Sequence, residues 1–174
     1  MIVRPAVEAD FPGFLALAAE VEHWFGAMVE EPGFHDAVRG SIRGSAALVA
    51  QEPGARPGAG LLGGLLFGAD AGADAGGGDG GGEGEGAATY HLHWLVVAER
   101  ARGTGAGRAL VDDAVRRYVT GPAVVEVITF GADHPGAVTS GARVFYERLG
   151  FTPGEAAGPG PEGGSRQVYR RTVV

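Results

Sequence analysis

The chain has 174 residues, no cysteine and a formal net charge of −7. That length suits one domain with a buried core, and the lack of cysteine excludes disulfides and thiolate metal sites. A chain this acidic is poorly suited to binding nucleic acid. Residues 1–5 have no apolar signal-peptide region, and no apolar run approaches the roughly 20 residues that span a bilayer. We therefore expect a cytoplasmic protein that binds neither nucleic acid nor membrane.

Apolar spacing predicts the elements in chain order. The first half reads as a strand at 2–4, helices at 11–21 and 34–43, and strands at 46–50 and 61–67. The second half reads as a strand at 90–97, a helix that ends before Gly121, a strand at 124–130, a helix at 137–149 and a strand at 167–173. Residues 68–88 are nearly all glycine, alanine and acidic residues, which predicts a flexible loop inside one domain that spans residues 1–174. This order predicts an α/β (α+β) domain with a mixed sheet covered by helices.

Small residues fill the turn between the strand at 90–97 and the helix that follows. Residues 102–108 read Arg-Gly-Thr-Gly-Ala-Gly-Arg. Glycines at a strand-to-helix turn let backbone N–H groups approach a ligand, and the helix N-terminus favours anions such as phosphate. The Gly-Lys-Ser/Thr of a nucleotide-binding P-loop is missing, and neither glycine frame completes the G-x-G-x-x-G/A of a dinucleotide fold. The turn therefore predicts another kind of phosphate ligand, or a glycine-rich connection without a ligand.

The pattern Arg102-x-x-Gly105-x-Gly107, after the apolar Leu95-Val96-Val97, resembles the cofactor motif of the GNAT family of N-acetyltransferases. The resemblance implies the GNAT fold, with six to seven strands, about four helices and a strand splay at the acetyl-CoA site. It also implies acetyl-CoA (coenzyme A) as cosubstrate and no metal. In that family the strand backbone binds the pantetheine arm, which here would fall to Leu95, Val96 and Val97. The pyrophosphate would bind at Arg102, Gly103, Thr104, Gly105, Ala106, Gly107 and Arg108.

A second motif lies at residues 142–151, Ala-Arg-Val-Phe-Tyr-Glu-Arg-Leu-Gly-Phe. It is similar to the end of the last helix in the GNAT family. The resemblance gives Tyr146 the role of general acid for the departing thiolate. A phenol with a pKa of about 10 is protonated at neutral pH and can donate to sulfur. The alternative is a tyrosine that only packs in the core. Gly150 is expected to end the helix in a left-handed conformation.

Two histidines stand two residues apart in the strand at 90–97. His91 and His93 should point to the same face, and Leu95 and Val97 should continue that face toward the glycine turn. A histidine with a pKa of about 6.5 can accept the proton of an attacking amine. His93 is the preferred acceptor, with His91 or water as alternatives. The competing interpretations are a structural pair and a metal site, and no metal is expected because the sequence shows no third ligand at a suitable local spacing. The same run is similar to a strand of the serotonin (arylalkylamine) N-acetyltransferases.

The acceptor site is less defined by the sequence. In the GNAT family the end of the first helix often builds the acceptor pocket, which here implies His23, Trp24, Phe25 and Met28. In many members of the GNAT family an asparagine after the fifth strand contacts the cofactor. This sequence has no asparagine there, and Asp133, Thr139 or Ser140 are the candidate replacements.

Together these motifs predict an acetyl-CoA-dependent enzyme that acetylates a small primary amine by direct attack. Three alternatives stay open: a non-catalytic acyl-CoA sensor or partner subunit, an enzyme that acetylates a protein or peptide amine, and an enzyme that uses another acyl donor. The sequence also leaves open whether the chain forms a homodimer.

Overall fold

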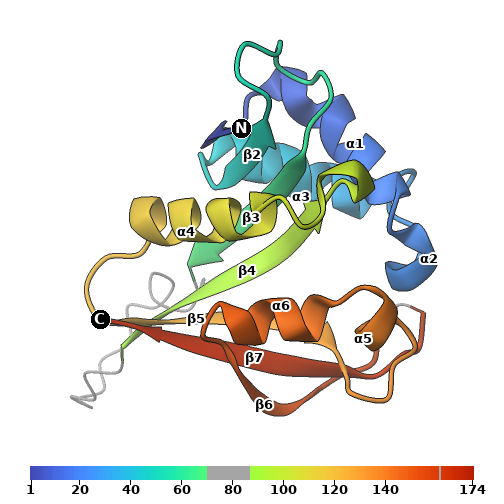
Figure 1. Ribbon diagram of the computed structural model, residues 1–174, viewed down its shortest axis with the longest axis vertical. Helices are drawn as coiled ribbons and strands as arrows, with labels where there is room; N and C mark the ends of the chain where they lie inside the picture. The colour runs from blue at the N-terminus through green and yellow to red at the C-terminus, as the bar shows by residue number, and fades with distance from the viewer. Residues whose placement is uncertain (70–86, 161) are drawn as a thin grey trace, which may run out of the picture.

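The computed structural model describes residues 1–69, 87–160 and 162–174. Its strands form one sheet of seven in the order β1-β2-β3-β4-β5-β7-β6 (Figure 1). The strands are β1 (Ile2–Pro5), β2 (Ala47–Gln51), β3 (Gly63–Ala69), β4 (Ala88–Val97), β5 (Ala123–Phe130), β6 (Thr152–Ala157) and β7 (Arg166–Val173). Only β4 and β5 pair in parallel, and the other neighbours are antiparallel. The mixed α/β sheet predicted from the sequence is confirmed.

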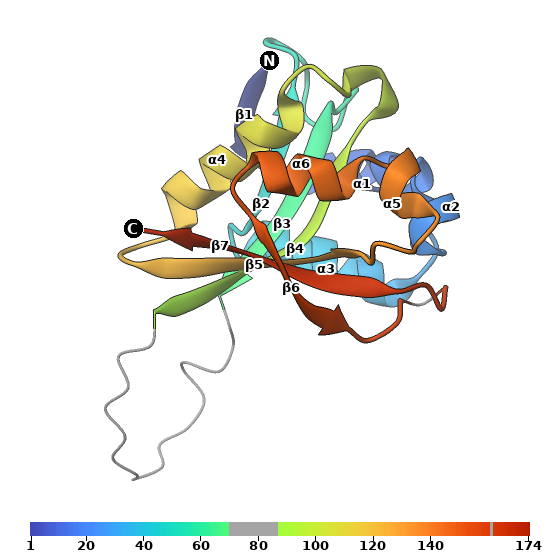
Figure 2. The same ribbon diagram turned by 60° about the horizontal axis from the view of Figure 1, so that its bottom comes forward.

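Helices cover both faces of this sheet (Figure 2). They are α1 (Phe11–Ala19), α2 (Glu22–Phe25), α3 (Pro32–Arg43), α4 (Ala106–Tyr118), α5 (Gly136–Thr139) and α6 (Ala142–Arg148), with 3-10 turns at Glu8–Asp10 and Glu99–Ala101. A side chain added at Gly64 of β3 would meet Phe14 of α1, whereas one added at Gly63 would meet Leu110 of α4. Because adjacent strand residues point to opposite faces, α1 and α4 cover opposite sides, called here the α1 face and the α4 face. None of the described helices is long and apolar enough to cross a membrane.

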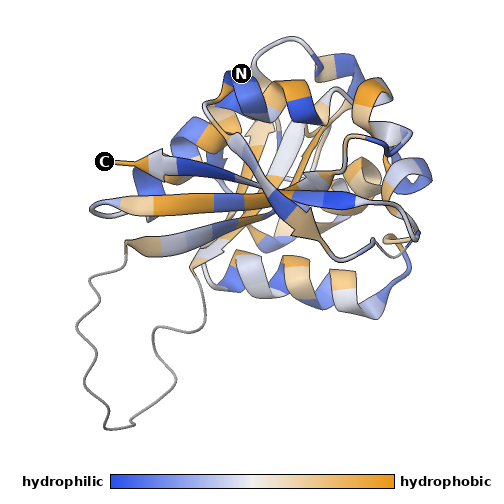
Figure 3. Ribbon diagram, turned by 90° about the horizontal axis from the view of Figure 1, so that it is seen from below, coloured by the Kyte–Doolittle hydropathy of each residue, from blue (hydrophilic) through white to orange (hydrophobic). Residues whose placement is uncertain are grey.

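The helices and strands bury their apolar residues against one another. Figure 3 shows hydrophobic and hydrophilic residues alternating along the helices that flank the sheet. The largest fully buried side chains come from both faces and from the strands between them: Phe14, Phe67, Phe130, Phe151, Tyr169, Leu48, Leu65 and Leu110. This continuous core fixes the positions of the strand ends, where the candidate site lies.

Several elements differ from the sequence prediction, and α2 (Glu22–Phe25) is a separate helix that was not predicted. The helix expected at 137–149 is divided into α5 and α6, because Gly141 adopts a left-handed φ of 68° between them. Val138, expected on the buried side, is 86% exposed. Strand β6 was not predicted, since its sequence Thr-Pro-Gly-Glu-Ala-Ala has few residues that favour strands. Residues 68, 69 and 88 belong to strands, and the rest of the loop expected at 68–88 lies outside the described residues except for residue 87.

The parallel strands β4 and β5 separate along their length. They pair from Ala88 with Ala123 as far as Leu92 with Val127. Beyond that point β4 continues to Val97 and β5 continues to Phe130 without pairing to each other. The splay expected from the GNAT resemblance is therefore present, and it leaves backbone groups of β4 available on one edge.

A buried carboxylate ties the N-terminal elements together. Asp10 is fully buried and accepts two hydrogen bonds from the Arg4 guanidinium, at 2.8 and 2.9 Å. It also accepts hydrogen bonds from the backbone amides of Val7 and Gly58, at 2.8 and 2.7 Å. Burial alone would raise the pKa of Asp10, but these hydrogen bonds hold it below its usual value. One carboxylate thus joins β1, the start of α1 and the loop before β3.

Candidate active site

The glycine turn borders a cavity of about 620 Å³. Gly103 and Gly105 have φ values of 76° and 91°, and Gly105 directly precedes the first residue of α4. The first N–H groups of a helix have no acceptor within the helix, so they are available to an anion at this end. Of the predicted cofactor residues, those that line the cavity are Leu95, Val96, Val97, Arg102, Gly103, Gly105, Ala106, Gly107 and Arg108. Thr104 does not line it, and its hydroxyl donates to the Ala101 carbonyl at 2.6 Å.

Gly107 lets α4 approach both α6 and β4. A Cβ atom at this position would lie 2.9 Å from the Phe145 ring and 3.3 Å from Val97 Cγ2. Both distances are shorter than ordinary carbon contacts of about 3.5–4.0 Å, so only glycine fits without a shift of its neighbours. The close approach holds the turn against the splayed end of β4.

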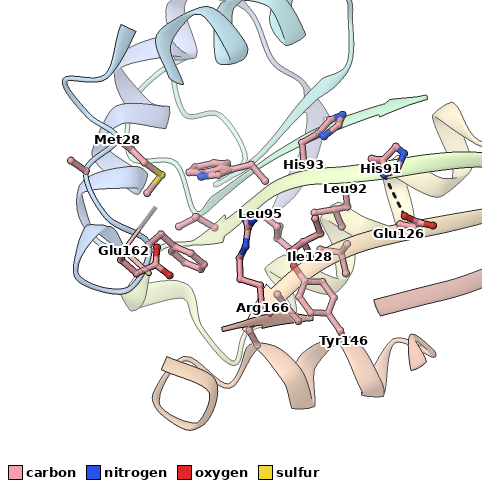
Figure 4. Close-up of a pocket in the computed structure, with 17 residues that line it drawn as sticks. Met28, His91, Leu92, His93, Leu95, Glu126, Ile128, Tyr146, Glu162 and Arg166 are labelled. Atoms are coloured by element: carbon pink, nitrogen blue, oxygen red, sulfur yellow. Dashed lines mark ion pairs between the residues drawn. The ribbon is translucent and has the colours of Figure 1, made fainter. Parts of the chain in front are cut away.

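A second cavity, of about 430 Å³, lies on the other side of the splay (Figure 4). We call it the acceptor cavity. Residues of α2, the segment that follows it, β4, β5, α6 and β7 line it, among them Met28, His91, His93, Glu126, Ile128 and Arg166. The two cavities share Phe25, Leu95, Val96, Ala142 and Tyr146. They therefore meet at the gap between β4 and β5.

Tyr146 stands at this junction. Its side chain is 7% exposed and packs edge-on against Phe145 and Phe151, with ring centroids at 5.1 and 5.5 Å. The motif that places it behaves as predicted: Gly150 has a φ of 88°, and the Phe151 amide donates to the Tyr146 carbonyl at 3.0 Å. Within the described part of the chain the hydroxyl has no hydrogen-bond partner. Burial raises the pKa of Tyr146 well above its usual value, so the phenol stays protonated.

The two histidines lie on the same face, as predicted. Their rings are 5.8 Å apart and nearly parallel, at 22°. A side chain added at Gly68 would come within 2.9 Å of His93 Nε2, so the ring lies close against β3. Although part of His93 is exposed, burial lowers its pKa from the usual value, and the neighbouring His91 lowers it further. His93 is therefore neutral at pH 7 and able to accept a proton.

The prediction that Leu95 and Val97 continue the histidine face is wrong. Leu66 of β3 pairs with Trp94 and Phe67 pairs with Leu92, so His93 is the extra residue of a β-bulge. Beyond the bulge the alternation is shifted by one residue. Trp94 packs against Phe14 on the α1 face, whereas Val97 contacts the α4 face at Gly107. The histidines thus lie on the α1 face, and Leu95 and Val97 lie on the α4 face.

Glu126 is a site residue that the sequence analysis missed. Its carboxylate lies 3.8 Å from His91 Nδ1 and accepts a hydrogen bond from Arg170 Nε at 2.8 Å. Arg170 in turn binds Glu155 of β6 through both terminal nitrogens. The signal in the sequence is that Glu126 is the one charged residue of the apolar strand at 123–130. It adds a carboxylate to the acceptor cavity beside the histidine pair.

The predicted acceptor residues are divided between the cavities. Phe25 and Met28 line the acceptor cavity. The Glu22 carboxylate holds this segment in place, because it accepts a hydrogen bond from the Met28 amide at 2.6 Å. Trp24 lines only the glycine-turn cavity, where the Arg102 guanidinium lies 5.1 Å from its ring centroid. His23 borders neither cavity.

Two further expectations concern the cofactor loop and metal binding. Of the three residues that could replace the asparagine of the family, Ser140 lines the glycine-turn cavity, and Asp133 and Thr139 do not. In the described ranges no three histidine or acidic side chains are grouped closely enough to hold a metal ion.

Comparisons with known proteins agree with this geometry. A family model described as the acetyltransferase (GNAT) domain matches residues 63–153, just over half of the chain. A sequence comparison with curated proteins gives no significant match. The fold is similar to a ribosomal-protein-alanine N-acetyltransferase from Brucella melitensis, at 19% identity and a TM-score of 0.67, over 99% of this chain and 100% of that one.

Two other solved structures show the same fold. A chain of the NatC complex bound to Gag peptide and CoA has 15% identity and a TM-score of 0.65, over 99% of this chain and 98% of that one. A GNAT acetyltransferase from Bacillus cereus has 11% identity and a TM-score of 0.65, over 99% and 97%. By the family model, the chain belongs to the GNAT acetyltransferase family.

Proposed function

We propose that the chain transfers an acetyl group from acetyl-CoA to a small primary amine by direct attack. The observation that carries this proposal is the junction of the two cavities at Tyr146, in the gap between β4 and β5. A donor bound along the glycine turn and an amine bound in the acceptor cavity would meet there without a covalent enzyme intermediate. Holding both reactants in one place supplies a large part of the rate enhancement.

The residues at the glycine turn fit coenzyme A. The N-terminus of α4 and the side chains of Arg102 and Arg108 offer N–H groups and positive charge to the pyrophosphate. Unpaired backbone groups of β4 near Leu95 and Val97 can bind the amide groups of the pantetheine arm. When bound, the cofactor would supply the activated thioester, and the protein supplies its orientation.

Two residues accept and donate the protons of the reaction. His93, neutral because of its lowered pKa, accepts the proton of the amine directly or through water, with His91 beside it. Tyr146, kept protonated by burial, donates to the thioester sulfur as the thiolate leaves. The proton that the amine loses balances the one that the sulfur gains.

A protein or peptide amine is the second candidate acceptor. It is favoured by the fold similarity to the ribosomal-protein-alanine N-acetyltransferase and to the peptide-bound NatC chain. Both structures are less than 20% identical to this chain, so the similarity concerns the fold and does not identify the acceptor. A third candidate, a non-catalytic acyl-CoA sensor or partner subunit, predicts cofactor binding without turnover.

Steady-state kinetics of two variants test the mechanism. General acid or base catalysis contributes about 10²–10⁴-fold, so Tyr146→Phe and His93→Ala should each lower kcat by about 100-fold or more on the acceptor that the protein uses. The KM for acetyl-CoA should change little, because Tyr146→Phe keeps the ring that lines the glycine-turn cavity and His93 does not line that cavity. Values of kcat within twofold of the unmodified protein for both variants would contradict the proposed roles.

A further inference from the structure

The carboxylates of Glu126 and Glu162, which line the acceptor cavity, each lie beside a basic side chain. Glu126 binds Arg170 at 2.8 Å and lies 3.8 Å from His91. Glu162 lies 3.5 Å from His134 Nε2. Both carboxylates that line the cavity therefore have a basic partner within the protein.

Arg166, which also lines the cavity, differs from these two carboxylates. Its Nε donates to the Gly158 carbonyl at 2.7 Å, but in the described ranges its two terminal nitrogens make no hydrogen bond and no ion pair. It stands at the first position of β7, opposite Phe130 of β5. Figure 4 shows its side chain extending from β7 into the acceptor cavity, with Glu162 and Met28 to one side and Tyr146 to the other.

We propose that Arg166 binds a carboxylate of the acceptor, so that the substrate is an amine of the amino acid class. This inference rests on the proposed function and names its substrate. A guanidinium presents two parallel N–H donors that match the two oxygens of a carboxylate. A partly buried guanidinium whose terminal nitrogens have no acceptor is unfavourable, and a substrate that carries a carboxylate removes that cost on binding.

The same contact would select against other amines. A polyamine or a simple alkylamine brings only positive charge toward Arg166 and leaves the guanidinium unpaired. A peptide N-terminus presents a neutral amide where a free amino acid presents a carboxylate. Arg166 would therefore act as a specificity residue that holds the acceptor while its amine reaches the junction at Tyr146.

Matched pairs of acceptors test the inference. The probes are L-amino acids and their carboxamides, assayed with acetyl-CoA by release of free thiol and by mass of the product. Since a hydrogen bond to a charged group contributes about 1.5–3 kcal/mol, kcat/KM for the best acid should exceed that for its amide by about 10- to 100-fold. Most of that difference should appear in KM, because Arg166 contacts the acceptor away from the reacting amine.

Arginine variants then assign the preference to one residue. Arg166→Gln should reduce the acid-to-amide ratio to within about twofold of one, and Arg166→Lys should leave an intermediate ratio because it keeps the charge but not the fork. Arg56→Gln, at an exposed arginine that lines neither cavity, is the matched control and should keep the full ratio. Stabilisation by acetyl-CoA, measured by thermal denaturation, should be the same in all four proteins.

The inference and the proposed function fail in different ways. Acetylation of amides, alkylamines or peptides at least as fast as of acids overturns the inference and leaves an acetyltransferase. An acid preference that survives in Arg166→Gln overturns the role of Arg166. Binding of acetyl-CoA without acetylation of any amine overturns both.

Discussion

At the scale of single residues, the proposed chemistry depends on how the fold shifts the pKa values of Tyr146 and His93. Burial keeps Tyr146 protonated, and burial together with His91 keeps His93 neutral. The sequence identified both residues from short motifs. It did not identify Glu126 or Arg166, because the importance of a lone charge depends on which strands lie beside it. The motifs predict an acid and a base, and only the packing shows which side chains surround them.

The lowered pKa of His93 predicts an acidic limb in the pH profile. Since the protonated histidine cannot accept a proton, kcat/KM should fall as pH decreases through a pKa below the ordinary value of about 6.5. The limb should be absent in His93→Gln, whose residual activity should not vary with pH in that range. His23→Gln serves as the control, because His23 borders neither cavity. An unchanged acidic limb in His93→Gln would assign it to another group.

At the scale of elements, the site is built by a bulge, a splay and a close helix approach. Strand patterns predicted β4 and its two histidines, but the inserted residue at His93 reverses the facing of every residue after it. Such a bulge leaves no clear mark in the sequence, since it arises from pairing with β3. The division of α5 from α6 at Gly141 was missed for a similar reason, because one glycine within an apolar helical pattern is commonly tolerated.

The approach of α4 to α6 predicts a binding defect. In Gly107→Ala the new methyl group would press on the Phe145 ring and displace the glycine turn. The KM for acetyl-CoA should rise about tenfold or more, with the rest of the fold retained. Gly40→Ala in α3 is a matched control, because nothing lies within 4 Å of the added methyl group and alanine favours the helix by about 0.5–1 kcal/mol. Wild-type KM in Gly107→Ala would show that the turn does not hold the cofactor.

The Asp10 anchor predicts a stability defect with a defined pH dependence. Asp10→Asn should reduce the free energy of unfolding by about 3 kcal/mol, because it removes the charge that Arg4 and two backbone amides share. Since the folded pKa is held below the unfolded value of about 3.9, this contribution is complete above that pH and is lost as pH falls toward the folded pKa.

The deficit of the Asp10→Asn variant should therefore shrink below about pH 4. Urea unfolding at pH 7 and pH 3 measures it. The exposed Asp36→Asn is the control and should change stability little at either pH. A deficit that stayed constant between the two pH values would mean that the carboxylate charge does not stabilise the fold.

At the scale of the whole molecule, two cavities on either side of one sheet meet through a gap between two strands. The fold class and the glycine turn could be predicted from the sequence, because they rest on residue patterns within continuous segments, whereas the strand splay was expected only from the resemblance to the GNAT family. The acceptor cavity could not be predicted from the sequence, because its lining comes from α2, β4, β5, α6 and β7, which are far apart in the chain. Rates of acetylation of different amines therefore test which acceptor the cavity binds.

The central claim is that amine and thioester meet at Tyr146. It is tested most directly by incubating the protein with acetyl-CoA labelled in its acetyl group and a panel of amino acids, alkylamines, arylalkylamines, polyamines and peptides. Mass spectrometry then follows the label. We predict labelled N-acetyl product from an amine in the panel, and a rate at least 100-fold lower in Tyr146→Phe with the same stabilisation by acetyl-CoA. Stabilisation of the protein by acetyl-CoA without label in any amine would contradict the account.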